Sequence, residues 1–221
     1  VNSEDDSLGT VQIVNKMSVI AGTVTGRGNA AGGIVGKIGK NTTFTMNTSS
    51  FQATVNGNGN NGGVVGLAEN ATFTNSVAVT VKTTVSSGNA MTAGGLIGKA
   101  QDAVSVTIEN VTLNGANIST EAKNNMNSKS GGIIGCWNDT SVTGRVSQEA
   151  ASFKNISIVS SSINGYDKAG IIGNLVGNNI LADTVLVDNA TKIGDSNNGI
   201  AGGVFGRVIG RNIDIKNSNI T

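Results

Sequence analysis

One five-residue motif recurs six times along the chain, and this repetition limits the possible fold more than any other feature. Each copy consists of a small residue, a glycine, two apolar residues and a final glycine, and successive copies lie 30 to 38 residues apart. A period of this length is typical of solenoids, in which each repeat packs on its neighbours. The glycines at the second and last positions of the motif are Gly33, Gly36, Gly63, Gly66, Gly95, Gly98, Gly132, Gly135, Gly170, Gly173, Gly203 and Gly206.

A second mark follows in each unit, where an asparagine ends a short run of alternating apolar and polar residues. We expect each of these asparagines to turn a corner between two strands, because asparagine tolerates the left-handed backbone region. Stacked asparagine side chains can also hydrogen-bond from coil to coil. The six asparagines are Asn47, Asn75, Asn110, Asn155, Asn189 and Asn217.

The residue types favour strands throughout. The chain has 32 glycines and no proline, and a proline would remove a ladder donor from any strand that contained it. Each unit has room for three short strands: the glycine motif, the run that ends at the asparagine, and the run after it. The sequence therefore predicts an all-β protein, a right-handed parallel β-helix of about six coils with three strands per coil. An antiparallel β-sandwich is the alternative, although it needs no such period.

We expect residues 1–221 to form a single solenoid domain. Before the first motif, residues 11–15 and 19–26 resemble the second and third strands of an earlier unit. After the last motif, residues 212–221 resemble a second strand and the start of a third. The units at both ends are therefore incomplete. This pattern predicts a segment of a longer repeat array, with flanking domains in the same chain.

Composition excludes several functional classes. The chain has no histidine, so histidine catalysis and histidine metal sites are impossible. The 15 basic and 14 acidic residues are scattered and give a net charge of +1, so we do not expect a nucleic-acid partner. No apolar run is long enough for membrane insertion. Cys136 is the single cysteine, and the sequence contains no residue pattern that indicates a cofactor.

The repeat resembles the GLUG-type repeat, which runs roughly Gly-Gly-Leu-Val-Gly and then Ile-x-Asn-Ser. Residues 94–98 with 108–111, and residues 62–66 with 73–76, carry this resemblance. GLUG-type repeats occur in large bacterial surface proteins, including adhesin-like proteins. The resemblance therefore implies a secreted or cell-surface β-helix with a spacer or binding role.

Two patterns in the sequence could suggest an enzyme. Residues 57–62 match Gly-x-Gly-x-x-Gly, but a strand-like segment follows where the dinucleotide fingerprint needs a helix. Glycoside hydrolysis needs two carboxylates about 5 to 10 Å apart. Asp102, Glu109, Asp139 and Glu149 fall in expected turns or strand edges, where solvated charges are the simpler interpretation. We therefore predict no catalytic residue.

Trp137 and Tyr166 are the candidate ligand contacts, because aromatic faces can stack on sugars; core filling is the alternative for Trp137. Cys136 occupies a slot that varies freely between repeats, so we expect this slot to face outward or lie at a corner. Its equivalents are Lys37, Leu67, Lys99, Asn174 and Arg207. Residues 119–130 and 138–150 are insertions, which in repeat proteins form surface loops and often binding faces. Neutral variation explains them equally well.

These observations predict a non-catalytic structural or adhesin segment, located outside the cell or on its surface. The expected partner is a host surface protein or a glycan. The alternative is a β-helix that binds or degrades polysaccharide, as many parallel β-helices do.

Overall fold

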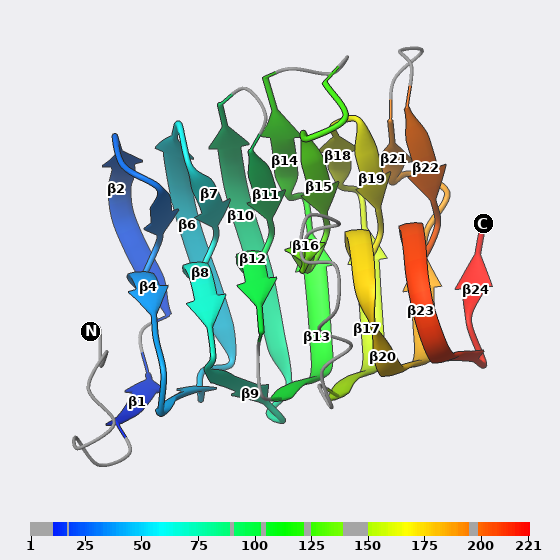
Figure 1. Cartoon of the computed structure of the whole chain (residues 1–221), viewed down its shortest axis with the longest axis horizontal. Helices are drawn as coiled ribbons and strands as arrows, with labels where there is room; N and C mark the ends of the chain where they lie inside the picture. Colours follow the sequence, from blue (N-terminus) through cyan, green and yellow to red (C-terminus); the bar gives the residue numbers. More distant parts are fainter. Residues whose placement is uncertain are drawn as a thin grey trace.

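The computed structural model describes residues 11–16, 18–88, 91–102, 105–121, 125–138, 150–194 and 199–221, in which every regular element is a β-strand (Figure 1). All strand pairs in these ranges are parallel, and each strand pairs with its counterpart one repeat earlier or later. This confirms the predicted parallel solenoid and excludes the antiparallel sandwich. The right-handed sense stays a prediction, in line with the usual hand of parallel crossovers.

A six-stranded sheet follows one side of the solenoid, and each of its strands ends at the first residue of the glycine motif. The next two residues form a bend, which we call the Gly-Gly bend although Ala169 replaces the first glycine in one coil. Because one strand comes from each coil, the sheet marks five complete turns between its first and last strands. Its strands are β3 (Ala30–Gly32), β7 (Asn60–Gly62), β11 (Thr92–Gly94), β15 (Lys129–Gly131), β19 (Asp167–Ala169) and β22 (Ile200–Gly202).

The larger sheet has eighteen strands, which occupy three further positions around the coil. The first position holds β4 (Val35–Ile38), β8 (Val65–Glu69), β12 (Ile97–Gln101) and β16 (Ile134–Trp137). The second position holds β1 (Val11–Asn15), β5 (Thr42–Met46), β9 (Thr72–Asn75), β13 (Ser105–Asn114) and β17 (Ala150–Val159). The third position holds β2 (Val19–Gly26), β6 (Ser50–Gly57), β10 (Val79–Ser87), β14 (Asn117–Thr120), β18 (Ser162–Asn164), β21 (Lys192–Ile193) and β24 (Asn219–Ile220). β13 and β17 run on into the third position, and two long strands, β20 (Ile172–Val187) and β23 (Phe205–Lys216), also continue through more than one position.

The prediction of three strands per coil does not hold for coils in which all the strands are separate. The coil from Asn60 to Ser87 has four strands, β7 to β10. The additional strand ends at the first residue of the motif, and the motif that we expected to be one strand bends at its second and third residues, Gly63 and Val64 in this coil. A Cβ atom at Gly63 would collide with the backbone oxygen of Gly95 in the next coil. The glycines are therefore required because backbones of adjacent coils approach closely at the bend.

The left-handed backbone expected of the six asparagines is found at three of them, although Asn110 and Asn155 lie within β13 and β17 and not between strands. Asn110, Asn155 and Asn217 have φ values of 59°, 52° and 47°, in the left-handed region. The Asn155 Nδ2 donates a hydrogen bond of 3.0 Å to the Asn110 Oδ1, which is the expected link between coils. Thr184 takes the equivalent position in the coil between Asn155 and Asn217, with φ 58°.

The other three asparagines correct the prediction. Asn75 lies in β9, buried and in register with Ile108, so it points inside the coil and turns no corner. Its Nδ2 donates to the backbone oxygens of Val77 at 3.0 Å and Glu109 at 2.6 Å. Asn47 and Asn189 lie between strands but without a positive φ. The sequence alignment missed the register because the second strand varies in length between coils.

The structure also reveals a corner that sequence analysis missed, between the first and second strand positions. One residue in each of six successive coils has a positive φ there, and all but one of these residues are asparagines. They are Asn41, Asn70, Asp102, Asn138, Asn179 and Asn212. Links between coils occur here too, since the Asn212 Nδ2 donates to the Asn179 Oδ1 at 2.9 Å.

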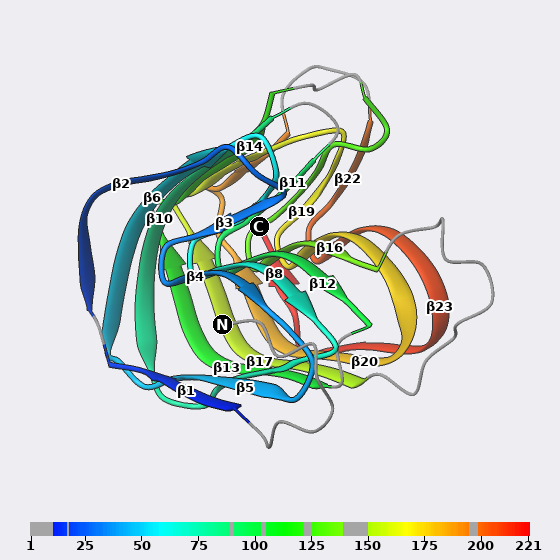
Figure 2. The same cartoon turned by 60° about the vertical axis from the view of Figure 1, so that its left-hand side comes forward.

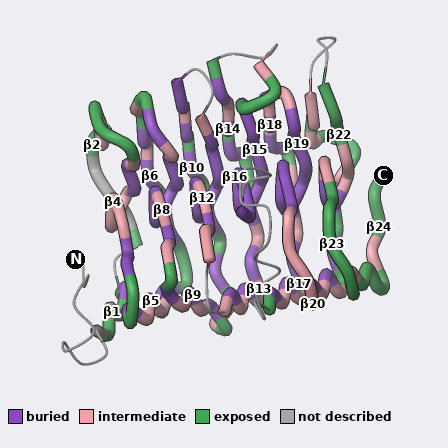
Figure 3. Tube along the Cα trace, in the orientation of Figure 1, coloured by how far each residue is buried: buried purple, intermediate pink, exposed green. Residues whose placement is uncertain are grey.

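One continuous apolar core fills the interior of the coils. Residues of the chain are mostly buried in the middle of the molecule and more exposed in the last coil (Figure 3). Phe44 and Phe73 show how the coils pack, with their rings stacked 5.2 Å apart in adjacent coils. The paired apolar residues of the glycine motif lie in or against this core, as predicted. In β23 and β24, Ile215 and Ile220 are 52% and 48% exposed, because only one neighbouring coil covers them.

Candidate functional site

Two columns of residues flank the Gly-Gly bend, where the small sheet meets the first-position strands (Figure 2). The first column contains the first residue of each small-sheet strand: Ala30, Asn60, Thr92, Lys129, Asp167 and Ile200. The second column contains the residue that follows each motif: Lys37, Leu67, Lys99, Cys136, Asn174 and Arg207. The second column contains the position that varies between repeats, and the structure confirms that its six residues lie in register in successive coils. Its first three members are partly exposed, as predicted, but Cys136 and Asn174 are fully buried.

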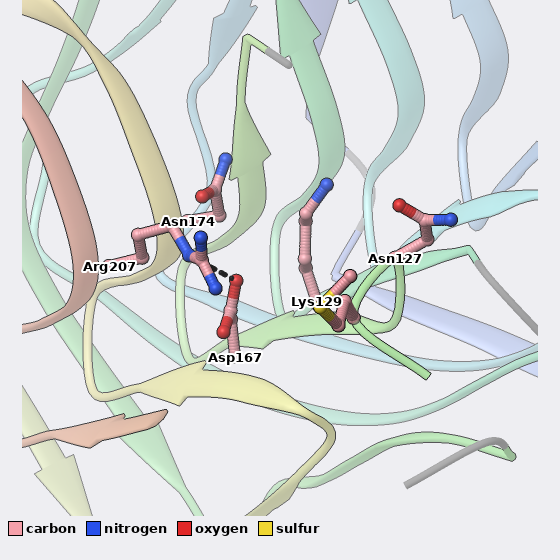
Figure 4. Close-up of a pocket in the computed structure, with 6 residues that line it drawn as sticks. Asn127, Lys129, Asp167, Asn174 and Arg207 are labelled. Atoms are coloured by element: carbon pink, nitrogen blue, oxygen red, sulfur yellow. Dashed lines mark hydrogen bonds and ion pairs between the residues drawn. The ribbon is translucent and has the colours of Figure 1, made fainter. Parts of the chain in front are cut away.

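A pocket of about 100 Å³ lies where residues of both columns meet in the later coils (Figure 4). Lys129 and Asp167 reach it from β15 and β19, and Asn174 and Arg207 reach it from β20 and β23. Met126 and Asn127 complete the lining from the segment before β15. Figure 4 shows Asn174, Arg207 and Asp167 on one side of the pocket and Lys129 and Asn127 on the other. Residues more than 80 positions apart in the sequence thus contribute to one concave site.

Asp167 is the only carboxylate among the residues that line this pocket, and its side chain is only 1% exposed. The Arg207 Nε donates a hydrogen bond of 3.0 Å to its Oδ2. Its Oδ1 is buried and has no hydrogen-bond partner. Burial raises the pKa of Asp167, and the nearby positive charges of Arg207, Lys129 and Lys168 oppose this shift only in part. The site thus holds a desolvated acid with one buried oxygen that lacks a hydrogen-bond partner.

Asn174 provides a second buried acceptor next to Asp167. Its Nδ2 donates to the backbone oxygen of Asn138 at 3.3 Å, and this bond fixes the orientation of the amide. Its Oδ1 is buried and has no hydrogen-bond partner. The Cys136 Sγ, in the same coil as Asn138, donates to the same Asn138 oxygen at 2.7 Å, so donors from two adjacent coils share this oxygen.

The rim of the pocket comes from the first predicted insertion, residues 119–130. Met126 is 65% exposed, and Asn127 is exposed beside it. The backbone of Asn127 donates to the Asn125 Oδ1 at 3.0 Å, which closes a local turn. The described part of this insertion therefore borders a concave site, where functional loops often lie, and neutral variation stays the alternative. The second insertion, residues 138–150, falls largely outside the described residues.

The two predicted ligand contacts do not lie in this pocket. Trp137 is fully buried in the core, packed beneath Gly177 of the next coil, so it supports the core-filling alternative and offers no face to a ligand. Tyr166 is partly exposed and precedes Asp167 in the chain, but it is not among the lining residues.

The structure describes two of the four carboxylates considered for catalysis. Asp102 occupies a left-handed corner with φ 47°, and Glu109 forms a surface ion pair of 3.7 Å with Lys154. Asp139 and Glu149 lie outside the described residues. The Gly-x-Gly-x-x-Gly segment, residues 57–62, leads from β6 into β7, and a bend and then β8 follow it where the dinucleotide fingerprint needs a helix.

Sequence analysis noted Asn174 and Arg207 only as occupants of a variable slot, and it missed Lys129 and Asp167. A signal was present in the residues just before each motif. The positions equivalent to Lys129 and Asp167 hold Ala, Asn, Thr and Ile in the other coils, so two charges there are unusual. We missed this signal because the short strand before the bend was not predicted.

The chemistry of the pocket favours hydrogen bonding over metal binding. Oxygen atoms of Asp and Asn are suitable ligands for hard cations, but Arg207 and Lys129 place positive charge beside them. In the described part of the chain, no group of three or more His, Cys, Asp or Glu side chains could hold a metal ion. Within the same ranges, no helix is long and apolar enough to span a membrane.

Comparisons of this chain with protein-family models, with curated proteins and with solved structures give no match.

Proposed function

We propose that this chain is a non-catalytic segment of an extracellular, adhesin-like protein, in which it acts as a rigid spacer and presents a binding surface for a host glycan or surface protein. The observation that carries the proposal is the unbroken stacking of coils. Both sheets and one apolar core run through successive repeats of the described chain. A parallel ladder advances by about 4.8 Å per coil, so added repeats extend such a segment in regular steps.

The surface location rests on the resemblance of the glycine motif to GLUG-type repeats, seen in residues 62–66 and 94–98. In a host known to encode this chain, antibody labelling of intact cells compared with lysed cells tests this part. Labelling of intact cells supports the proposal, and labelling only after lysis contradicts it.

The binding role is tested with the labelled 221-residue chain on an array of glycans and on immobilised host surface proteins. A parallel incubation with soluble polysaccharides measures the release of new reducing ends. Binding without release supports the proposal. Release of oligosaccharides contradicts it and favours the degrading β-helix, whereas failure to bind either kind of partner leaves only the spacer role.

Polysaccharide binding is the second candidate, and the pocket beside the Gly-Gly bend favours it over degradation. Asp167 is the only carboxylate among the pocket-lining residues, whereas glycoside hydrolysis uses a pair about 5 to 10 Å apart. A single buried acid beside an arginine and an amide can recognise hydroxyl groups without cleaving the sugar.

A further inference from the structure

We infer that the pocket lined by Asp167, Asn174 and Arg207 binds one edge of a neutral sugar ring, with two adjacent hydroxyls donating to the Asp167 Oδ1 and the Asn174 Oδ1. The inference deepens the proposed function, because it assigns the glycan to a particular site. The class of ligand, a glycan, rests on that proposed function. The position of the site rests on the geometry of the pocket.

The first step of the argument is the pair of acceptors. Buried polar atoms in folded proteins almost always have a hydrogen-bond partner, and a buried acceptor without one is costly. Here two such atoms, the Asp167 Oδ1 and the Asn174 Oδ1, belong to residues that line one pocket. Arg207 and Asn138 hold the other atoms of these two groups, so the free oxygens cannot readily turn to other partners. A ligand that donates one hydrogen bond to each of these oxygens would satisfy both of them.

The second step is the charge around the acceptors, which selects among donors. Arg207 and Lys129 line the pocket, and Lys168 adds positive charge near Asp167. A metal cation or an ammonium group would be repelled by these side chains. A hydroxyl group carries no charge and can also accept a hydrogen bond. Arginine has five N–H donors, and one of those of Arg207 is used by Asp167, so others can donate to the same hydroxyls.

The third step is size and shape. A pocket of about 100 Å³ suits the edge of one ring better than a whole oligosaccharide. Met126, 65% exposed at the rim, offers an apolar surface against which the C–H groups of a sugar can pack. Two hydroxyls in the pocket and a C–H face on Met126 would place the rest of a glycan along the outer surface of the solenoid.

The test uses nuclear magnetic resonance titration of the isotope-labelled 221-residue chain. The probes are the methyl glycosides of mannose, galactose, glucose and fucose, each raised to about 50 mM, because a single ring held by a few hydrogen bonds binds in the millimolar range. At least one probe is expected to shift backbone signals of residues 167, 174 and 207. No shift with any probe, or shifts confined to other coils, would overturn the inference.

Variants then test the two acceptors. Asn174→Leu and Asp167→Asn are expected to weaken binding about tenfold or more, because each disturbs one buried hydrogen bond to the ligand. Lys99→Gln is the matched control, since Lys99 lies in the same column two coils before Asn174, and it should leave binding unchanged. Each variant is first checked for a folded spectrum. Unchanged affinity in both folded pocket variants would overturn the inference.

Calcium chloride is titrated in parallel. Shifts of the same pocket signals by calcium, without any by the glycosides, would overturn the inference in favour of a cation site. The outcome is separable from the proposed function. If the intact chain binds glycans on the array while the pocket variants bind equally well, the pocket assignment fails and the adhesin proposal stands.

Discussion

At the scale of single residues, the corners of each coil depend on backbone conformations that few side chains tolerate. Asn155 is exposed and has φ 52°, and its side chain bonds to Asn110. Asn155→Ala should lower the free energy of unfolding by about 1 to 2 kcal/mol, because alanine is strained in the left-handed region. Asn155→Gly loses the same side-chain bond without that strain and should cost about 1 kcal/mol less. Chemical denaturation compares the two variants, and equal losses would contradict the assignment of strain.

The raised pKa of Asp167 predicts that its contribution to the free energy of unfolding changes with pH in the opposite sense to that of most carboxylates in folded proteins. Burial raises its pKa above the ordinary 3.8, and Arg207, Lys129 and Lys168 do not fully compensate. The folded state therefore holds the proton to a higher pH than the unfolded chain does. Its contribution to the free energy of unfolding is greatest below the ordinary value and is lost as pH rises through the folded pKa. Thermal unfolding between about pH 3 and 7 should show Asp167→Asn gaining stability relative to wild type as pH rises.

Asp183 is the matched control for this experiment. Asp183 is partly exposed, and the hydrogen bond from the Asn217 side chain holds its pKa below the usual range. Its contribution is present at high pH and is lost as pH falls through the folded pKa, so Asp183→Asn should lose stability relative to wild type as pH rises. If the stability of Asp167→Asn and that of the wild type changed with pH in the same way, the argument that burial raises the pKa of Asp167 would be contradicted.

At the scale of elements, the Gly-Gly bend is the feature least tolerant of change. A Cβ at Gly63 would collide with the backbone of Gly95, which cannot move without displacing the next coil. Gly63→Ala should therefore lower the free energy of unfolding by about 3 kcal/mol or more. Gly28→Ala is the control, because a Cβ there meets nothing within 4 Å, and its effect should stay within about 0.5 kcal/mol. Similar losses in both variants would show that close approach does not explain the motif.

At the scale of the whole molecule, stability should be nearly a sum over coils and their interfaces. Deleting residues 63–94 joins Gly62 to Gly95 and removes one period, since β7 and β11 occupy equivalent places in the small sheet. The remaining coils can stack as neighbours, so the shortened protein should fold with about one coil's share of stability lost.

Deleting only residues 63–78 should be far more damaging, although it removes fewer residues. It joins β7 directly to Val79 of β10 and eliminates β8 and β9, so the chain cannot return in register to the first and second positions. Thermal unfolding of both deletions provides the comparison. If the full-period deletion were the less stable of the two, the additive view of the solenoid would have to be abandoned.

The accuracy of sequence analysis differed between the fold and the site. The glycine period and the alternating apolar runs predicted parallel stacking, because each coil repeats the same local pattern of residues. The short strand before each bend was missed, since three residues such as Lys129–Gly131 carry no periodicity of their own. Asn75 was misplaced because coils of unequal length shift the alignment by a few residues. Trp137 was considered a ligand contact, and only its complete burial showed that it packs in the core.

The sequence by itself determined the repeat period, the strand-rich solenoid and the places where glycine is needed, because these features are set by local residue patterns that recur in each coil. The tertiary structure alone decided that Asp167 meets Arg207 forty positions away and shares a pocket with Asn174. Such contacts depend on the register between coils and on the path of the loops that connect them. The burial that leaves two acceptor oxygens without partners likewise comes from the neighbouring coils and loops, which no single segment of sequence contains.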